Sequence, residues 1–367
     1  MPLDLPPDEV RAYLRSEDAP TPMLDLVGLM AAQAAVTAVE LGVFDALGSG
    51  PRGARDLATV LGLQPDGLAT LLDALVAVGY LDRDGEDGQR YANRPATDRW
   101  LRTDTPGGYA GVLGLWVSIV TELWGGLAEA LRGQAPRADF YPWLVKDSGR
   151  LERFQRLQRD LAGWLADEVV ERMSLPGGAA RLLDLGGGHG WYSVAFCQRH
   201  PALTATVVDL PAALDVGRDT VAGAGLGDRV AFHAGDLTEG VAEGIAAAGH
   251  DVVLLFNVVH GFDPVRARAL VHAAVAAARP GGTVAVLETE PQPRAGVVEH
   301  AFTRCFALNL WHTQGGQVYP PATLAGWLVE AGCESPEELP LDRSPTHVLL
   351  VARRGGPDGG GPEGDRS

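Results

Sequence analysis

The segment 182–191 combines an apolar strand, an acid and a turn packed with glycine. Glycines stand at Gly186, Gly188 and Gly190, shortly after Asp184. A turn without Cβ atoms lets a ligand lie against bare backbone, and the helix predicted at 191–200 offers free N–H groups. Asp209 ends the next predicted strand, 204–208, where a carboxylate can accept both hydroxyls of a ribose. The spacing predicts a site for a nucleoside-containing ligand.

The type of nucleotide follows from the third glycine of the motif. A dinucleotide fingerprint needs a small residue where this chain has Trp191, which is too large. The form present is Asp-x-Gly-x-Gly-x-Gly over 184–190. Taken alone, this motif leaves open a glycine-rich connection that binds nothing.

The elements that follow predict a parallel α/β sheet with its polar groups at one edge. Strands are expected at 229–233, 251–256 and 283–287, with a helix at 265–278 that Arg279-Pro280-Gly281-Gly282 stops. The apolar run 251–256 is typical of a central strand covered on both faces. Polar residues at the carboxyl ends of such strands mark a ligand crevice.

Composition restricts the partners of the chain. Its 367 residues allow two domains, and its net charge of -17 disfavours nucleic acid and anionic membranes. Three scattered cysteines have no metal-ligand spacing and fit a reducing cytoplasm. We therefore expect a cytoplasmic protein without a metal site, and the sequence contains no evident signal peptide or membrane span.

The N-terminal third predicts a winged-helix module. Helices are expected within 24–47, at 55–61 and at 68–78, and the segments 80–83 and 89–92 form a hairpin. The helix 68–78 contains no Lys or Arg, so reading of DNA bases is not expected. Ala and Val between Met30 and Glu40 predict close helix packing. We interpret the module as a dimerisation and lid element of a homodimer.

Four segments organise the chain. We expect a winged-helix domain at 1–106, a helical linker and pocket region at 107–175, a catalytic domain at 176–354 and a disordered tail at 355–367. Aromatic residues are frequent between 107 and 173, and some of them could line an apolar substrate pocket.

These motifs together resemble the small-molecule O-methyltransferases that carry an N-terminal winged-helix dimerisation domain. The resemblance rests on the helical module, the glycine turn, Val208-Asp209-Leu210-Pro211, Gly235-Asp236, the His260 segment and Gly315-Gly316. It implies a class I methyltransferase fold: a Rossmann-like, mostly parallel sheet with an antiparallel last strand. It also implies S-adenosylmethionine as cofactor, S-adenosylhomocysteine as its product and a small aromatic substrate.

The resemblance assigns roles to individual residues. It implies that His260 is the general base and that Glu288 orients it. It implies that the helix with Phe302, Phe306 and Asn309 lines the acceptor pocket, although these aromatic residues could also be ordinary core residues. Trp116, from the aromatic segment 107–173, is a further candidate for substrate binding. The residues expected to bind cofactor are Asp184, Gly186, Gly188, Gly190, Asp209, Leu210, Asp236, Leu237 and Asn257. The family also has a second acid near Gly315-Gly316, and Val318 stands in its place here.

The function expected from this resemblance is methylation of a phenolic hydroxyl of a polyketide-like secondary metabolite, as in antibiotic biosynthesis. The methyl group would pass in line to the oxygen while His260 takes the proton. Two alternatives stay open: non-methylating chemistry such as decarboxylation, hydroxylation or pericyclic cyclisation, and a winged-helix regulator. A structural histidine at a strand end is the alternative for His260.

Overall fold

The structure, a computed structural model, describes residues 3–16, 18–85, 88–134, 139–292 and 296–356. It has two compact units, Met1–Glu122 and Leu123–Ser367. The predicted linker and pocket region, 107–175, therefore has residues in both units. The predicted domain bounds stay predictions, and most of the predicted tail lies outside the described residues.

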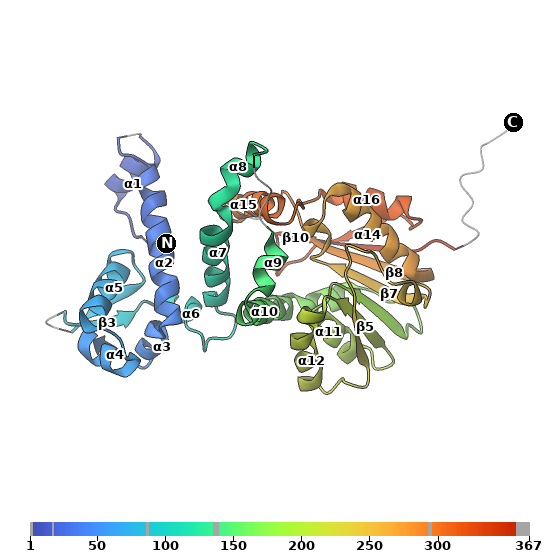
Figure 1. The fold of residues 1–367 in the computed structure, drawn as a ribbon, viewed down its shortest axis with the longest axis horizontal. Coiled ribbons are helices and arrows are strands. Elements are labelled where there is room, and N and C mark those ends of the chain that lie inside the picture. Colours follow the sequence, from blue (N-terminus) through green and yellow to red (C-terminus); the bar gives the residue numbers. More distant parts are fainter. Residues whose placement is uncertain (1–2, 17, 86–87, 135–138, 293–295, 357–367) are drawn as a thin grey trace. The chain divides into compact units, whose positions relative to one another are not determined.

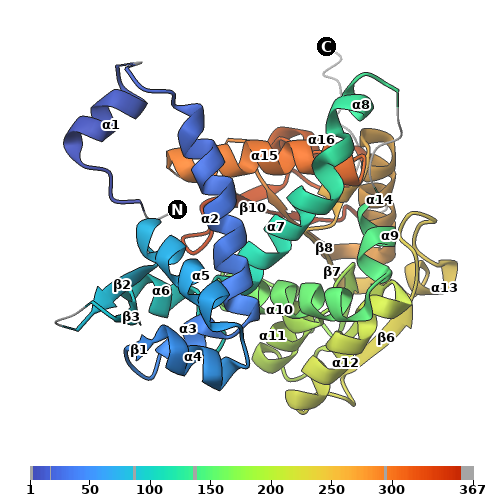
Figure 2. The same cartoon turned by 60° about the vertical axis from the view of Figure 1, so that its left-hand side comes forward.

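The first unit has the predicted helices and hairpin. Its core contains Phe44, Leu57, Leu72 and Leu75, all fully buried. Three short strands pair in the antiparallel order β1-β3-β2, and β2–β3 is the predicted hairpin (Figure 2). The elements are α1 (Pro7–Leu14), α2 (Pro22–Glu40), α3 (Val43–Leu47), β1 (Arg52–Gly53), α4 (Ala54–Leu61), α5 (Pro65–Ala77), β2 (Leu81–Asp84), β3 (Arg90–Asn93), α6 (Pro95–Trp100) and α7 (Ala110–Leu123), which ends at the unit boundary.

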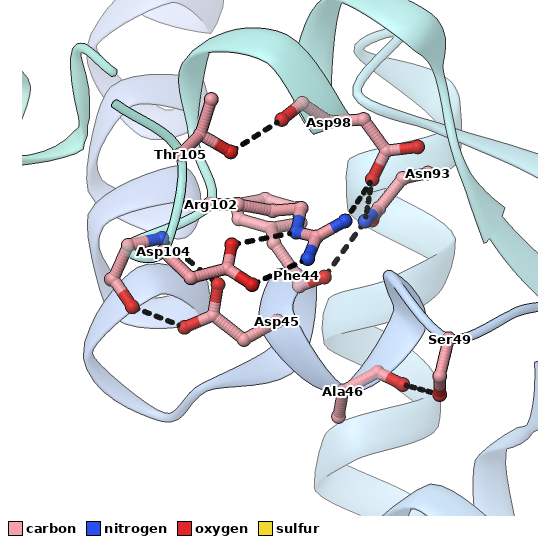
Figure 3. A network of polar contacts seen from close by, with 10 residues as sticks. Phe44, Asp45, Ala46, Ser49, Asn93, Asp98, Arg102, Asp104 and Thr105 are labelled. Carbon is pink, nitrogen blue, oxygen red and sulfur yellow. Dashed lines mark hydrogen bonds and ion pairs between the residues drawn. The ribbon is translucent and has the colours of Figure 1, made fainter. Parts of the chain in front are cut away.

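A polar network joins α3 to β3 and to the chain after α6 (Figure 3). Asn93 Nδ2 donates to Phe44 O at 2.7 Å and to Asp98 Oδ1 at 2.8 Å. Asp45 Oδ1 accepts the backbone N–H of Thr103 at 2.9 Å. Exposed ion pairs stabilise little by themselves, but bonds that tie backbone groups of different elements fix how those elements meet.

Helix α2 has one face in the core and one face in solvent. Ala35 and Ala38 are buried among the core residues of the first unit, as the predicted close packing of this stripe requires. Leu26, Leu29 and Met30 are about half exposed. By length and apolar composition alone, α2 and the stretch Ala110–Leu131 could each cross a membrane.

The second unit is built on a seven-stranded sheet with the order β6-β5-β4-β7-β8-β10-β9. Strand β10 is antiparallel to both its neighbours, and the strands from β6 to β8 are parallel, as predicted. Every residue of β7 is buried, in agreement with a central position. The strands are β4 (Arg181–Leu185), β5 (Thr204–Asp209), β6 (Val230–Ala234), β7 (His250–Phe256), β8 (Ala278–Thr289), β9 (Glu337–Leu339) and β10 (His347–Arg353).

Helices cover both faces of this sheet (Figure 1). One core joins the sheet to α10, α11 and α12, and a second core joins it to α14 and α16. The helices are α8 (Leu127–Leu131), α9 (Phe140–Val145), α10 (Ser148–Arg172), α11 (Trp191–Arg199), α12 (Leu214–Gly223), α13 (Glu243–Ala246), α14 (Pro264–Ala277), α15 (Val297–Thr313) and α16 (Pro321–Glu330), with short 3-10 turns η1 (Trp124–Gly126), η2 (Pro211–Ala213) and η3 (Val259–Gly261).

Strand β8 begins five residues earlier than predicted. Arg279-Pro280-Gly281-Gly282 lies inside the strand, and the pairing with β7 shifts register between His250 and Val252. A Cβ on Gly282 would lie 2.9 Å from His250 O, so the glycine allows the two backbones to approach at this irregularity. The sequence predicts Pro280-Gly281-Gly282 as a connection because an irregular strand and a turn can have the same glycine-rich composition.

Candidate active site

The glycine turn after β4 needs its glycines for two different reasons. Gly186 and Gly190 have φ of 76° and 68°, in the left-handed region that side chains with a Cβ rarely adopt. A Cβ on Gly186 would also lie 2.4 Å from Val258 Cγ2, in the loop after β7. The turn is therefore packed directly against the loop that carries His260.

Asp184 lies beneath the turn and not at its surface. Only 1% of this residue is exposed, and Ser193 Oγ on α11 donates to its Oδ2 at 2.9 Å. A Cβ on Gly187 would lie 2.3–2.5 Å from the Asp184 carboxyl group. Burial raises the pKa of Asp184 to about 7. Asp184 therefore supports the glycine turn from below, and in a cofactor site its role would be to hold the shape of that turn.

Asp209 occupies the predicted position at the end of β5. Its Oδ2 accepts the backbone N–H of Gly188 at 2.8 Å, and its Oδ1 accepts that of Leu210 at 2.7 Å. Burial raises the pKa of this carboxyl group. The structure thus places Asp209 directly beside the glycine turn, where a ribose could reach both.

The third acid, Asp236, follows β6 and is exposed. Its Oδ1 accepts the backbone N–H of Thr238 at 2.8 Å, and Leu237 packs partly against the core next to α14. Tyr141 on α9 belongs to the same neighbourhood: its pKa is raised by desolvation of its hydroxyl group and by the nearby charges of Asp209 and Asp236, although the residue as a whole is about half exposed. The sequence placed Tyr141 only among the aromatic residues of 107–173 that could line a pocket, because nothing in its spacing relates it to β5 or β6.

His260 and Glu288 meet as the resemblance implied. His260 lies in η3 after β7, and its Nδ1 is 2.5 Å from Glu288 Oε2 at the end of β8. The other oxygen, Oε1, accepts the backbone N–H of Val258 at 2.9 Å and that of Val259 at 2.6 Å. One buried carboxylate therefore orients the histidine ring and also holds the turn on which the ring sits.

Backbone contacts fix the same loop from two further directions. Asn257, between β7 and η3, has a φ of 55° and is the non-glycine residue with positive φ within the described part of the chain. A Cβ on Gly316 would lie 1.9 Å from His260 O, and the N–H of Gln317 donates to that oxygen at 2.9 Å. The late Gly315-Gly316 pair thus lets the segment after α15 pass directly against the base loop.

Helix α15 brings aromatic rings to the histidine. The rings of His260 and Phe306 are 5.4 Å apart and tilted edge to face. Phe302 and Phe306 lie stacked with centroids 6.2 Å apart. One predicted substrate residue, Phe306, therefore lies next to the predicted base, and a second, Phe302, stacks on Phe306.

Asn309, expected to anchor an oxygen of the substrate, is a buried residue of α15. It is only 2% exposed, and its Oδ1 accepts the indole N–H of Trp124 at 3.0 Å. Its amide oxygen is therefore paired inside the protein, and the expected anchoring of a substrate oxygen, which would use the amide nitrogen, stays a prediction. Helical spacing put Asn309 on the face of Phe302 and Phe306, but it could not show that Trp124 reaches it from 185 positions away.

Trp116 and position 318 take no part in the contacts described so far. Trp116 lies on α7 in the first unit, and its assignment to the substrate pocket stays a prediction. Val318 is buried, so an apolar side chain stands where the resemblance implies a second acid. Among the described residues no group of three or more His, Cys, Asp or Glu could hold a metal ion.

Gln155 on α10 is a residue that the sequence did not single out. It is 8% exposed, and a Cβ on Gly188 would lie 3.0 Å from its Oε1. The signal was present only as a polar residue among apolar neighbours in the buried face of a long helix, which is too weak to assign a role.

Comparison with known proteins agrees with this geometry. A family model described as an O-methyltransferase domain matches residues 134–334, and one described as an O-methyltransferase dimerisation domain matches 24–103. A 3-hydroxy-5-methyl-1-naphthoate 3-O-methyltransferase from Streptomyces sahachiroi is 30% identical over 86% of this chain and 89% of its own length. A tetracenomycin polyketide synthesis 8-O-methyl transferase from Streptomyces glaucescens is 29% identical over 85% and 93%.

Solved structures agree as well. A mitomycin 7-O-methyltransferase has a TM-score of 0.80 at 26% identity, covering 92% of this chain and 98% of that one. An O-methyltransferase family protein from Burkholderia thailandensis has a TM-score of 0.76 at 27% identity, covering 92% and 99%. With a glycine turn and three strand-end acids in the expected places, the chain belongs to the S-adenosylmethionine-dependent O-methyltransferase family that carries a dimerisation domain.

Proposed function

We propose that this enzyme methylates a phenolic hydroxyl of a polyketide-like aromatic secondary metabolite, with His260 as the general base. The single observation that carries the proposal is the bond between His260 Nδ1 and buried Glu288 beside the rings of α15. The names of the Streptomyces relatives, which act on a hydroxynaphthoate and a polyketide, support the substrate class.

The geometry leaves one ring nitrogen of His260 for the substrate. With Glu288 as the acceptor, Nδ1 carries the hydrogen, so Nε2 presents its lone pair. A phenol has an ordinary pKa of about 10 and histidine one of about 6.5, so the proton transfer costs roughly 5 kcal/mol without help. Glu288 lowers this cost because its negative charge stabilises the charged ring.

The residues present fit the cofactor that the family uses. When bound, S-adenosylmethionine supplies an electrophilic methyl group on a positively charged sulfur. Gly186, Gly188 and Gly190 keep the turn free of side chains, so the cofactor can lie against its backbone. The packing of the turn against the protein itself requires these glycines. We assign Asp209 and Leu210 to the ribose side, and Asp236 with Leu237 to the adenine side.

Two residues have indirect parts in this assignment. Asp184 supports the glycine turn from below through Ser193. Asn257 holds the corner between β7 and the base loop in a left-handed conformation that asparagine tolerates better than most residues. Both remain proposals about the cofactor site.

The test of the base is the His260→Ala variant. We expect S-adenosylhomocysteine to bind with unchanged affinity by calorimetry, while product formation from a phenolic acceptor falls about 10²–10⁴-fold. His272→Ala, on α14, is the matched control and should keep full activity. Retained turnover of His260→Ala would refute the assignment of the base.

The buried Val318 keeps a second function open. Without the second acid of the family, the site could use the cofactor as a fixed charge for decarboxylation, hydroxylation or pericyclic cyclisation. Stoichiometric formation of S-adenosylhomocysteine with each methylated product supports methyl transfer. Acceptor conversion without it would support the alternative.

We further propose that the enzyme is a homodimer joined through its first unit. Its match to a dimerisation domain and the exposed side chains of Leu26, Leu29 and Met30 on α2 support this proposal. Light scattering should give the mass of a dimer for the wild type and of a monomer for the Leu26→Glu, Leu29→Glu double variant. A monomeric wild type would contradict it. A cytoplasmic location stays a prediction.

A further inference from the structure

Gln155 is a buried amide for which the structure provides no hydrogen-bond partner. It lies on α10, is 8% exposed, and its side chain makes no hydrogen bond to any residue that the structure describes. The amide is not among the polar atoms that the described protein encloses completely, so it remains open to a ligand. A mostly buried amide that lacks a protein partner but stays accessible is suited to bind such a ligand.

The position of the amide identifies the ligand. A Cβ built on Gly188 would lie 2.8 Å from Asp209 Oδ2, 3.0 Å from Gln155 Oε1 and 3.3 Å from Ala213 Cβ. Asp209 Oδ2 and Gln155 Oε1 therefore both lie close to Gly188, on the side of the turn where a side chain is missing. Helix α10 packs against η2, the turn that follows Asp209, so this placement is part of the fold.

The chemistry of the two oxygens selects a donor between them. A carboxylate and an amide oxygen are both acceptors, so neither can satisfy the other. A sugar hydroxyl can donate to one of them, and two neighbouring hydroxyls can serve both. We propose that Gln155 is a cofactor-contact residue whose amide binds the ribose of the nucleoside together with Asp209. This inference rests on the proposed placement of the cofactor at Asp209.

The variant Gln155→Leu tests the contact, because leucine has a similar size and no hydrogen-bonding group. Calorimetry should show affinity for S-adenosylhomocysteine reduced about tenfold, and a similar loss for adenosine, which has the ribose but no amino-acid part. The melting temperature of the ligand-free protein should stay unchanged, because the amide of Gln155 makes no hydrogen bond within the described protein. The variant Gln198→Leu, on an exposed position of α11, is the matched control.

Each outcome has a defined meaning. Unchanged affinity in Gln155→Leu overturns the inference, and so does a loss for S-adenosylhomocysteine with none for adenosine, because the contact would then lie at the amino-acid end. A lower melting temperature of the ligand-free protein together with weaker binding indicates a merely structural role and overturns it too. Failure of the wild type to bind either compound overturns the cofactor placement at Asp209 itself. The conservative Gln155→Asn should keep part of the affinity.

Discussion

Substitution of Glu288 by glutamine separates the two tasks of this side chain. Glu288 Oε1 accepts the N–H groups of Val258 and Val259, and Oε2 holds His260 Nδ1. In Glu288→Gln the amide oxygen can still accept the two backbone N–H groups. The amide nitrogen then donates to Nδ1, which moves the ring hydrogen to Nε2 and leaves no lone pair for the substrate.

The expected magnitudes differ between activity and stability. Loss of the base should lower kcat about 10²–10⁴-fold, which is about 3–5 kcal/mol in the activation free energy. The free energy of unfolding should change little in Glu288→Gln. In Glu288→Ala the same loss of kcat should come with about 2–4 kcal/mol of destabilisation, because two backbone N–H groups lose their buried acceptor.

The assay is a pH–rate profile with a phenolic acceptor, combined with chemical unfolding and Glu337→Gln on β9 as control. Residual activity of Glu288→Gln should rise about tenfold per pH unit up to the pKa of the phenol, since the substrate must then arrive ionised. A Glu288→Gln enzyme with kcat within about threefold of the wild type would refute the tautomer argument. Equal destabilisation of both variants would refute the argument on the backbone N–H groups.

Three further predictions concern the turn and the base loop. Burial raises the pKa of Asp184 to about 7 in the folded protein. In the unfolded chain this carboxyl group loses its proton near pH 4. The free energy of unfolding therefore decreases as the pH rises from about 4 to about 7, because the folded protein holds the proton that the unfolded chain has lost. Asp184→Asn should therefore have a free energy of unfolding up to about 4 kcal/mol higher than the wild type at pH 7.5, and the difference should be much smaller at pH 5. Denaturant unfolding of the ligand-free protein measures both differences, and equal values at the two pH values would contradict this prediction. Gly316→Ala should displace the backbone at His260 and abolish turnover in the acceptor assay. The control Gly326→Ala, whose Cβ would lie in open space on α16, should keep activity and raise the free energy of unfolding by about 0.5–1 kcal/mol. A normal kcat in Gly316→Ala would refute the packing argument. Asn257→Gly removes the side chain but can keep the left-handed backbone. Calorimetry should therefore show weaker binding of S-adenosylhomocysteine, caused by loss of the side chain alone. Unchanged affinity would show that Asn257 does not contact the cofactor.

Much of the fold could be predicted from the sequence because its signals are local. The apolar runs of β4 and β7 and the glycines between β4 and α11 each determine conformation within a few residues. Strand-end acids such as Asp209 could be found for the same reason, since parallel strands of one sheet present their carboxyl ends at one edge. The register shift in β8 could not, because a glycine-allowed bulge and a turn have the same composition.

The parts of the site that could not be predicted depend on contacts between distant segments. Trp124 pairs with Asn309, and Gln155 lies close to Gly188, from helices whose spacing only says which side chains share a face. Periodicity identifies the buried face of a helix but not its partner. The bonds from Glu288 to the backbone of Val258 and Val259 were hidden for the same reason.

The absence of the second acid can be understood from how the base loop is held. The segment that carries this acid in the family here contacts the loop through its backbone: Gln317 N–H donates to His260 O at 2.9 Å, and Gly316 permits the approach. Tyr319 Oη donates to Phe262 O at 2.6 Å from the same segment. These bonds fix the loop whatever side chain stands at position 318, and Glu288 holds Nδ1 of the ring. A buried valine at this position is therefore compatible with a positioned base, because the backbone contacts and Glu288 hold the loop and the ring without a second acid.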